Sequence, residues 1–228
     1  LIARPDDWSS HYNKGIFHQN RGEAKEALNS YETAARLYPE SLMPLINSSV
    51  LYSYTGNQAK AEENLKKVLE IAPDNEAANL NLGLLLAEQG RMQEAEKALH
   101  AALAANPKQA VAAYNLSVIY SQKNMDEAVK FATIAAEAMP EEPKYTYTLA
   151  FYKLQNNQKV QAENLLRQLL EKQPNYLNAV SLLADIYINE GRNMEAAALF
   201  QKTLKAEGIS DNDRKAIEEA LNSIKKQN

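Results

Sequence analysis

Cysteine is absent from this chain of 228 residues. Its absence excludes disulfides, thiolate metal sites and thioether-attached haem within the chain. It leaves the compartment open, because a cysteine-free protein is compatible with reducing and oxidising surroundings alike. No uninterrupted apolar run approaches the roughly 20 residues that a membrane-spanning helix needs, so no membrane partner is expected.

The chain also lacks a large excess of charge of either sign, and it lacks recognisable catalytic motifs. The 25 basic and 29 acidic side chains leave a net charge of −4, which gives no electrostatic reason to expect a nucleic-acid partner. His11 and His18 lie seven residues apart, or about 10 Å along a helix, too far for one metal ion with ligand bonds of about 2 Å. No glycine-rich phosphate-binding motif occurs. We therefore expect no metal, no cofactor, no catalytic residue and no enzymatic activity.

What the chain does have is a repeat of about 34 residues. Two residue types mark the period. The prolines stand at Pro5, Pro39, Pro73, Pro107, Pro140 and Pro174, and the alanines stand at Ala27, Ala61, Ala95, Ala128, Ala162 and Ala196. Both series are one residue short in the same repeat, between Tyr120 and Ala128. Two series that shift together indicate one structural unit, and such a period is typical of stacked helical repeats.

Each repeat reads as two helices. In the third, apolar residues recur at helical spacing before and after the break at Gly90. The equivalent breaks, where a left-handed backbone is expected, fall at Gly22, Gly56, Gly90, Asn124, Asn157 and Gly191. Proline ends each pair of helices because it lacks the amide donor that a continuing helix requires.

The pattern resembles the tetratricopeptide repeat. Its signature contains a small residue with an aromatic nearby, then Ala-x3-Phe and a closing Pro. The residues that carry the resemblance are Leu82-Gly83, Ala95-x3-Leu99, Leu116-Ser117 with Tyr120, Ala27-x3-Tyr31, and Ala184 with Tyr187 and Ala196-x3-Phe200. The end repeats depart from it, because Trp8 lies outside the usual slot, His18 replaces an aromatic and Gly208 replaces the last proline. The resemblance implies an all-α protein, a right-handed α-solenoid superhelix of six helical hairpins with a C-terminal capping helix.

The repeats set the predicted organisation of the chain. It runs as a remnant of a preceding repeat (1–7), six repeats (8–41, 42–75, 76–109, 110–142, 143–176 and 177–210) and a capping helix (211–228). Ser210 or Asp211 can cap that last helix, whose apolar residues form one narrow stripe. The opening Leu1–Pro5 resembles the end of a hairpin, so we expect the parent protein to continue upstream.

The resemblance implies a concave surface lined by the first helix of each hairpin. The sixth position of the first four repeats holds Asn13, Asn47, Asn81 and Asn115, and Thr148 follows in the fifth. An amide offers a donor and an acceptor, which suits pairing with an extended peptide backbone. The alternative is that these amides bond between neighbouring hairpins, and both interpretations stay open.

Apolar and aromatic residues flank this ladder. Those chosen as groove candidates are Tyr12, Tyr114, Tyr147 and Phe151. The family also clamps C-terminal carboxylates with Lys and Arg, but here Lys144 is the one basic residue among comparable positions, which disfavours that use. The groove is therefore expected to be neutral and partly apolar.

The leading hypothesis is a non-catalytic scaffold that binds a peptide or partner domain along the concave groove. The alternative is a structural spacer or self-association arm of a larger protein. Arg4–Trp8 and Pro143–Phe151 look similar to repeat regions of exported bacterial multihaem cytochromes, although no haem-binding motif occurs here. A soluble protein of the bacterial periplasm or cytoplasm is expected; the sequence decides neither the compartment nor the oligomeric state.

Overall fold

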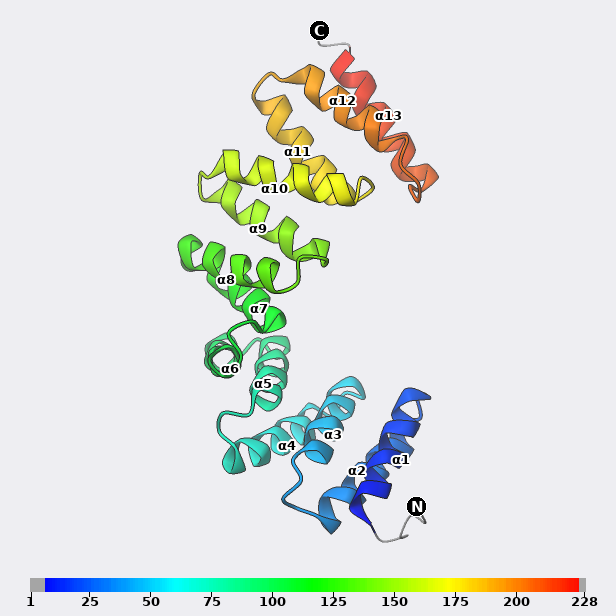
Figure 1. The fold of residues 1–228 in the computed structure, drawn as a ribbon, viewed down its shortest axis with the longest axis vertical. Helices are drawn as coiled ribbons and strands as arrows, with labels where there is room; N and C mark the ends of the chain where they lie inside the picture. The colour runs from blue at the N-terminus through cyan, green and yellow to red at the C-terminus, as the bar shows by residue number, and fades with distance from the viewer. Residues whose placement is uncertain (1–6, 226–228) are drawn as a thin grey trace. The chain divides into compact units, whose positions relative to one another are not determined.

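Helices form the whole of the regular structure that a computed structural model describes, which covers residues 7–225 (Figure 1). Thirteen α-helices and no strand occur in this range. The predicted all-α class is thereby confirmed. None of the described helices combines the length and the apolar character that crossing a bilayer would require.

The helices follow one another as six hairpins and a last single helix. The first helices of the hairpins are α1 (Trp8–Asn20), α3 (Met43–Tyr54), α5 (Glu76–Glu88), α7 (Ala110–Tyr120), α9 (Pro143–Gln155) and α11 (Leu177–Asn189). The second helices are α2 (Ala24–Leu37), α4 (Gln58–Ile71), α6 (Met92–Ala105), α8 (Met125–Ala138), α10 (Lys159–Lys172) and α12 (Asn193–Thr203), and α13 (Asp211–Lys225) comes last. The chain divides into two compact units, up to Leu116 (unit 1) and from Ser117 (unit 2).

Small residues let the two helices of a hairpin approach closely. The alanines of the repeating series, Ala27, Ala61, Ala95, Ala128, Ala162 and Ala196, have no exposed surface. Gly83 of α5 faces Leu99 of α6 so closely that an added Cβ would lie 2.7 Å from Leu99 Cγ. Larger side chains at these positions would force the paired helices apart.

The turns within hairpins mostly use the left-handed backbone that the sequence predicts. Gly90 has a φ of 75° and Asn157 has a φ of 59°. Asn124 was expected to do the same, and this expectation is wrong, because its φ is −154°. Its side-chain oxygen instead accepts hydrogen bonds from the amides of Asp126 and Glu127, so Asn124 is the N-cap of α8. The repeat that is one residue short therefore has a different turn.

The first and the last described helix each begin at a side-chain cap. The Asp7 side chain accepts a hydrogen bond from the Ser9 amide and begins α1; the rest of the predicted N-terminal remnant lies outside the described residues. Ser210 Oγ accepts a hydrogen bond of 3.2 Å from the Asp213 amide and caps α13. The buried stripe of Ile217, Leu221 and Ile224 joins the core of unit 2. This apolar stripe covers the last hairpin, as the amphipathic pattern of the helix requires.

Candidate functional site

The four asparagines of the predicted ladder lie in three different environments in unit 1. The amide of Asn47 donates a hydrogen bond of 3.2 Å to Tyr12 Oη and lies 3.5 Å from Tyr31 Oη. Burial raises the pKa of Tyr31, so its phenol is neutral at physiological pH. Asn47 therefore ties α3 to the preceding hairpin, as the second sequence interpretation described.

The other three amides differ from Asn47. Asn115 donates to the Val111 carbonyl of its own helix at 2.8 Å. Asn13 is exposed and Asn81 is half-buried, and neither side chain hydrogen-bonds to another residue in the described range. Asn13 and Asn81 therefore keep a donor and an acceptor available for a ligand.

A cavity of about 260 Å³ opens beside Asn81, between α3, α4 and α5 of unit 1. We call it the inner cavity; its lining is Ser49, Val50, Ser53, Tyr54, Ala61, Leu65, Asn81, Leu84, Leu85 and Glu88. Ala61 and Leu65 form a buried floor, whereas Val50 is 43% and Tyr54 is 85% exposed. Exposed apolar side chains around a partly polar hollow are a feature of binding surfaces.

Of the ten lining residues, Asn81 alone was among the sequence-predicted site residues, and three of the others lie at groove positions of the repeat. Ser53, Tyr54 and Glu88 occupy the twelfth and thirteenth positions of their repeats, which the family pattern also places on the groove. Applying the repeat register to those positions would have identified them. Tyr54 in particular is an exposed aromatic side chain beside the cavity.

The predicted site residues of unit 2 form an aromatic surface instead of an amide ladder. The rings of Tyr147 and Phe151 stack with centroids 6.5 Å apart, and Tyr147 meets Tyr176 edge-on at 5.8 Å. Thr148 donates a hydrogen bond of 2.8 Å to the carbonyl of Lys144 in its own helix. Lys144 places its ammonium 5.2 Å from the ring centroid of Tyr145. Tyr114, in unit 1, is half-buried.

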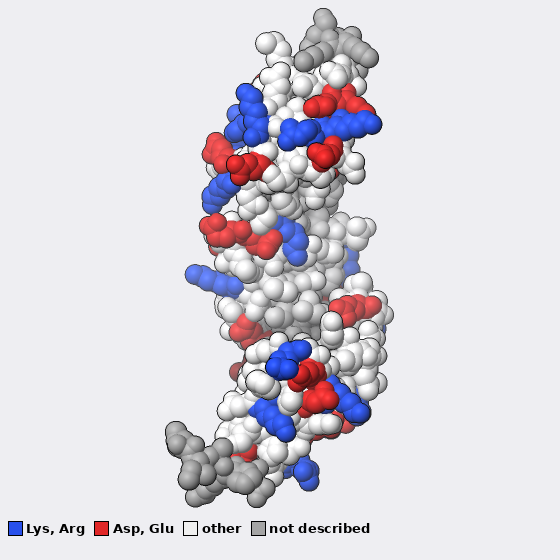
Figure 2. All heavy atoms as spheres, turned by 90° about the vertical axis from the view of Figure 1, so that its right-hand side faces the viewer, with Lys and Arg blue, Asp and Glu red and all other residues white. Residues whose placement is uncertain are grey.

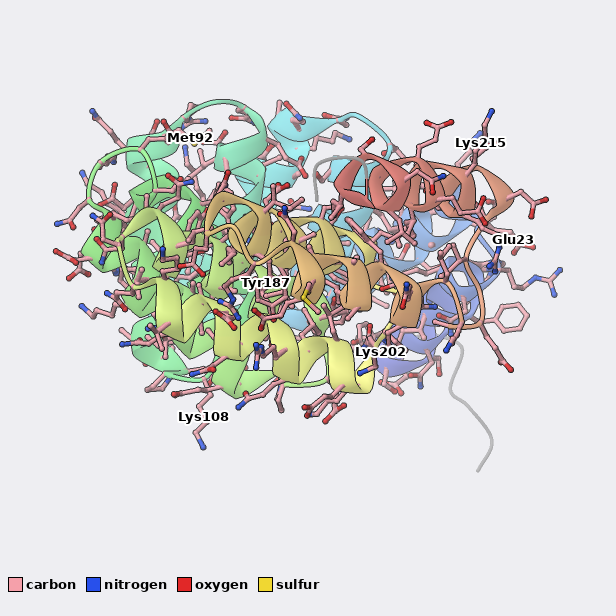
Figure 3. The ribbon with its side chains drawn as sticks, turned by 90° about the horizontal axis from the view of Figure 1, so that it is seen from above. Glu23, Met92, Lys108, Tyr187, Lys202 and Lys215 are labelled. Atoms are coloured by element: carbon pink, nitrogen blue, oxygen red, sulfur yellow. The ribbon has the colours of Figure 1, made fainter. Side chains whose placement is uncertain are left out.

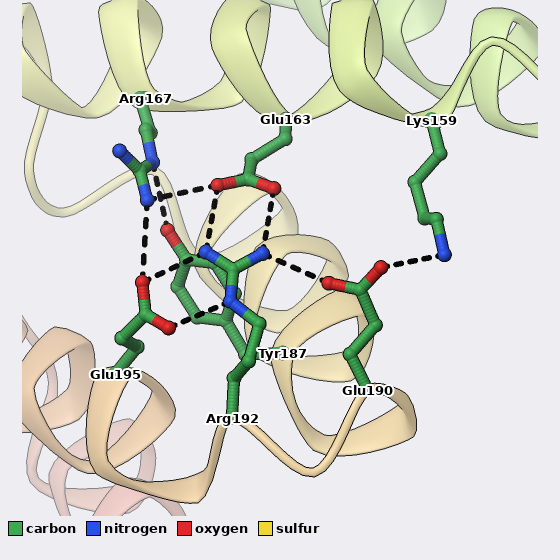
Figure 4. Close-up of polar contacts among 7 residues, drawn as sticks. All are labelled: Lys159, Glu163, Arg167, Tyr187, Glu190, Arg192 and Glu195. Carbon is green, nitrogen blue, oxygen red and sulfur yellow. Dashed lines mark hydrogen bonds and ion pairs between the residues drawn. The ribbon is translucent and has the colours of Figure 1, made fainter.

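A second polar constellation lies at the junction of α10, α11 and α12 in unit 2 (Figure 4). We call it the Arg192 cluster; it comprises Lys159, Glu163, Arg167, Tyr187, Glu190, Arg192 and Glu195. The Arg192 guanidinium donates to Glu163 at 2.8 and 3.0 Å and to Glu195 at 2.6 and 2.7 Å. It also donates to Glu190 at 2.8 Å. Such forked contacts are among the stronger hydrogen bonds of proteins.

The carboxyls of this cluster are held in their charged form. The hydrogen bond from Arg192 lowers the pKa of Glu163, and the nearby Arg167 charge adds to the effect. Hydrogen bonding to Arg192 likewise lowers the pKa of Glu195. Arg167 Nε donates a hydrogen bond of 2.8 Å to the hydroxyl of the buried Tyr187. The Tyr187 ring lies among the helices of unit 2 (Figure 3). The side chain of Lys108, by contrast, projects away from its ribbon in the same view.

A smaller version of this constellation occurs in unit 1. The Arg91 cluster consists of Glu62, Lys66, Arg91 and Glu94, and Arg91 donates to Glu62 at 2.7 Å and to Glu94 at 2.6 and 2.8 Å. In both clusters the charges are already paired with each other. Paired charges that join consecutive hairpins connect repeats, and they offer no unpaired acid, base or nucleophile for chemistry.

The described residues contain no group of His, Cys, Asp and Glu side chains arranged to hold a metal ion. Figure 2 shows a face on which acidic and basic side chains lie next to each other instead of forming a field of one sign. Of the sites described, the inner cavity is the one that combines a free amide, that of Asn81, with the exposed apolar side chains of Val50 and Tyr54, and this combination suits binding.

Comparison with family models agrees with this architecture. A model described as tetratricopeptide repeat matches residues 55–119 and 153–208, which is more than half of the chain, and a second model of the same description matches residues 9–41. The chain belongs to the tetratricopeptide repeat family. No curated protein matches the sequence.

Solved structures of repeat proteins share the fold. MamA (residues 41 to the end) from Desulfovibrio magneticus RS-1 is 25% identical, with a TM-score of 0.63 over 74% of this chain and 96% of that one. PilF of Pseudomonas aeruginosa is 17% identical, with a TM-score of 0.73 over 93% and 97% of the two chains. YrrB, titled a TPR protein with an unusual peptide-binding site, is 18% identical, with a TM-score of 0.61 over 78% and 92%. Proteins of this family are in general interaction scaffolds without catalytic activity.

Proposed function

We propose that this protein is a non-catalytic interaction scaffold that binds an extended peptide segment of a partner protein along the first helices of its hairpins. The inner cavity carries the proposal. Its lining combines the free amide of Asn81 with the exposed side chains of Val50 and Tyr54. An extended segment needs backbone hydrogen-bond partners and a hollow for a side chain, and both are present there.

The family and the fold support this proposal. Tetratricopeptide repeats serve as protein-interaction modules, and YrrB, which shares the fold, is titled as a peptide-binding protein. The paired charges of the Arg91 and Arg192 clusters support the same division of roles. In each cluster an arginine at the start of a second helix binds a glutamate of the preceding second helix, and none of the cluster residues lines the inner cavity.

Affinity capture from the native organism's lysate tests the proposal. The wild-type chain is compared with a variant carrying Val50→Ser, Tyr54→Ala and Asn81→Ala, after circular dichroism has shown that the variant melts cooperatively. Val160→Ser is the matched control, because Val160 is 73% exposed on α10 and is not part of the lining of the inner cavity. We expect a partner that the wild type and the control retain and the triple variant loses.

Two other outcomes would count against the proposal. Equal capture by all three proteins would place the interaction away from the first helices. No partner for any of them, together with self-association in analytical ultracentrifugation, would favour a structural or self-association arm. If a partner is captured, protection of α3 and α5 from hydrogen exchange on binding locates the contact.

A further inference from the structure

We infer that the inner cavity accepts an apolar side chain whose neighbour in the peptide is a lysine or arginine, so the partner of unit 1 is a segment with an apolar–basic pair. This inference rests on the proposed function and adds the chemistry of the ligand.

The size and lining of the cavity select a single apolar side chain. Its volume of about 260 Å³ has room for an apolar side chain of a bound segment. The floor of Ala61 and Leu65 is buried and apolar, and Val50 and Leu84 form apolar walls. Removing an aliphatic side chain from water at this place is favourable, and a polar side chain would find few partners on the floor.

The charge around the cavity is negative and has no cation to balance it. The sequences of α3 and α5 contain no Lys or Arg. Glu88, at the rim, is exposed and takes part in no ion pair within the described range. Glu76, the other acidic residue of α5, accepts hydrogen bonds from Asn106 and Gln109 and is not part of the lining.

The basic residues of α4, the third helix that lines the cavity, and of the turn after α5 are already occupied. The three lysines of α4 bind elsewhere, Lys60 to Tyr52, Lys66 to Glu62 and Lys67 to Glu63. Arg91, which follows α5, is held in the Arg91 cluster. A cation on the ligand beside Glu88 therefore meets a carboxylate without a competing basic group from these helices.

The free polar groups fit a peptide backbone. Asn81 offers a donor and an acceptor, and the Ser53 hydroxyl, which makes no hydrogen bond in the described range, offers another. Both belong to the lining, together with the apolar floor and Glu88. A segment that places its apolar side chain on the floor can thus bond through its backbone and direct the next side chain toward the rim.

Selection from a phage-displayed library of random nine-residue peptides, on the full-length chain, tests the inference. Three proteins are used in parallel: the wild type, Glu88→Lys and the control Glu70→Lys. The control makes the same change of charge at an exposed residue of α4 that is not part of the lining. We expect the wild type and the control to enrich apolar–basic pairs, and Glu88→Lys to replace the basic residue with an acidic one. For a synthetic wild-type-selected peptide, Glu88→Lys should weaken binding about threefold to fivefold in fluorescence anisotropy, the scale of a solvent-exposed ion pair.

The outcomes separate this inference from the proposed function. Peptides that depend on Tyr54 and Asn81 but show no preference for a basic residue would overturn the inference and leave the scaffold proposal standing. The same basic preference on wild type and Glu88→Lys would also overturn it, since Glu88 would not be its cause. Failure to select any peptide would overturn the inference, while the lysate capture decides independently whether the protein binds a partner.

Discussion

The Arg91 cluster in unit 1 and the Arg192 cluster in unit 2 occupy the same register positions three repeats apart, yet they are built to different strengths. Each is centred on the arginine of a Gly-Arg pair. This arginine binds one glutamate of the preceding hairpin and a second glutamate that lies three residues after the arginine itself. Unit 2 adds the hydroxyl of Tyr187 and the carboxylate of Glu190. Unit 1 has Leu86 and Gln89 at those positions.

The comparison teaches that the arginine is the residue that distinguishes these two junctions from the others. At the junction of the first and second hairpins, Asn57 takes the place of the arginine and Leu28 takes the place of the glutamate. At the junction of the fourth and fifth, Gln158 and Val129 do the same. At the junction of the third and fourth, Glu96 keeps the glutamate position, but Met125 stands 29 residues further on in place of an arginine. The glutamate thus occurs without the arginine, whereas each of the two ionic clusters has both charges.

Acidification should affect the Arg192 cluster most strongly. Hydrogen bonds from arginine or lysine lower the pKa of Glu163, Glu190 and Glu195 in the folded protein, so the unfolded chain binds more protons at acidic pH. Their contribution to the free energy of unfolding is complete above the ordinary value of 4.5 and is lost as the pH falls below it, through the folded pKa values. We expect the melting temperature to drop steeply in this range.

The check compares two variants across pH by circular dichroism. Replacing Glu163, Glu190 and Glu195 by Gln should lower the melting temperature at neutral pH and flatten its acid dependence. The double variant Glu62→Gln, Glu94→Gln, which removes two carboxylates whose pKa values are also lowered, should flatten it less. Equal flattening by the two variants would show that the clusters are of equal strength.

A single deletion sharpens the comparison at neutral pH. Glu163→Ala leaves Arg192 and Arg167 without their shared carboxylate, and we expect a loss of about 1–2 kcal/mol after allowing for the solvent access of the arginines. Glu62→Ala, the matched change in unit 1, should cost about 1 kcal/mol or less, because Lys66 is 59% exposed. Hydrogen exchange measured by mass spectrometry over α10–α12 and α4–α6 reads the two units separately. A larger loss in unit 1 would contradict the ranking.

The hydroxyl of Tyr187 is the next smaller difference. Tyr187→Phe keeps the buried ring and removes the acceptor of the Arg167 hydrogen bond, so a loss of about 0.5–1.5 kcal/mol is expected. Urea denaturation followed by circular dichroism measures it. Tyr54→Phe is the control and should leave stability unchanged, because its hydroxyl is on an exposed side chain and has no described partner. An unchanged midpoint for Tyr187→Phe would show that water replaces the bond.

The fold could be predicted almost entirely from the sequence because the residues that end the helices of each repeat act locally. A glycine or asparagine turn and a closing proline end helices by backbone sterics alone, whatever lies nearby. The error at Asn124 has a physical reason. An asparagine can adopt a left-handed backbone or cap a helix, and in the repeat that is one residue short the second use occurs.

The candidate site could be predicted only as a set of positions. The register assigned one role to Asn47, Asn81 and Asn115, but their hydrogen bonds depend on neighbours from other helices. Tyr12 occupies the amide of Asn47, and nothing in the described range occupies that of Asn81. The ionic junctions were within reach of the sequence, since a glutamate and an arginine 29 residues apart recur at Glu62 and Arg91 and at Glu163 and Arg192.

The outermost member of the Arg192 cluster should matter least. Lys159 is 49% exposed and contacts Glu190 at 2.6 Å, and Glu190 is also bound by Arg192. Unit 1 has Gln58 at the equivalent position. In Lys159→Gln the carboxylate keeps its arginine, and the lost pair is one that water and salt already weaken. We expect a change in melting temperature within experimental error at physiological salt, and a small decrease that emerges only at low salt. A decrease as large as that of Tyr187→Phe would mean that Lys159 holds Glu190 in place for Arg192, so the strength of the cluster in unit 2 would originate at its rim.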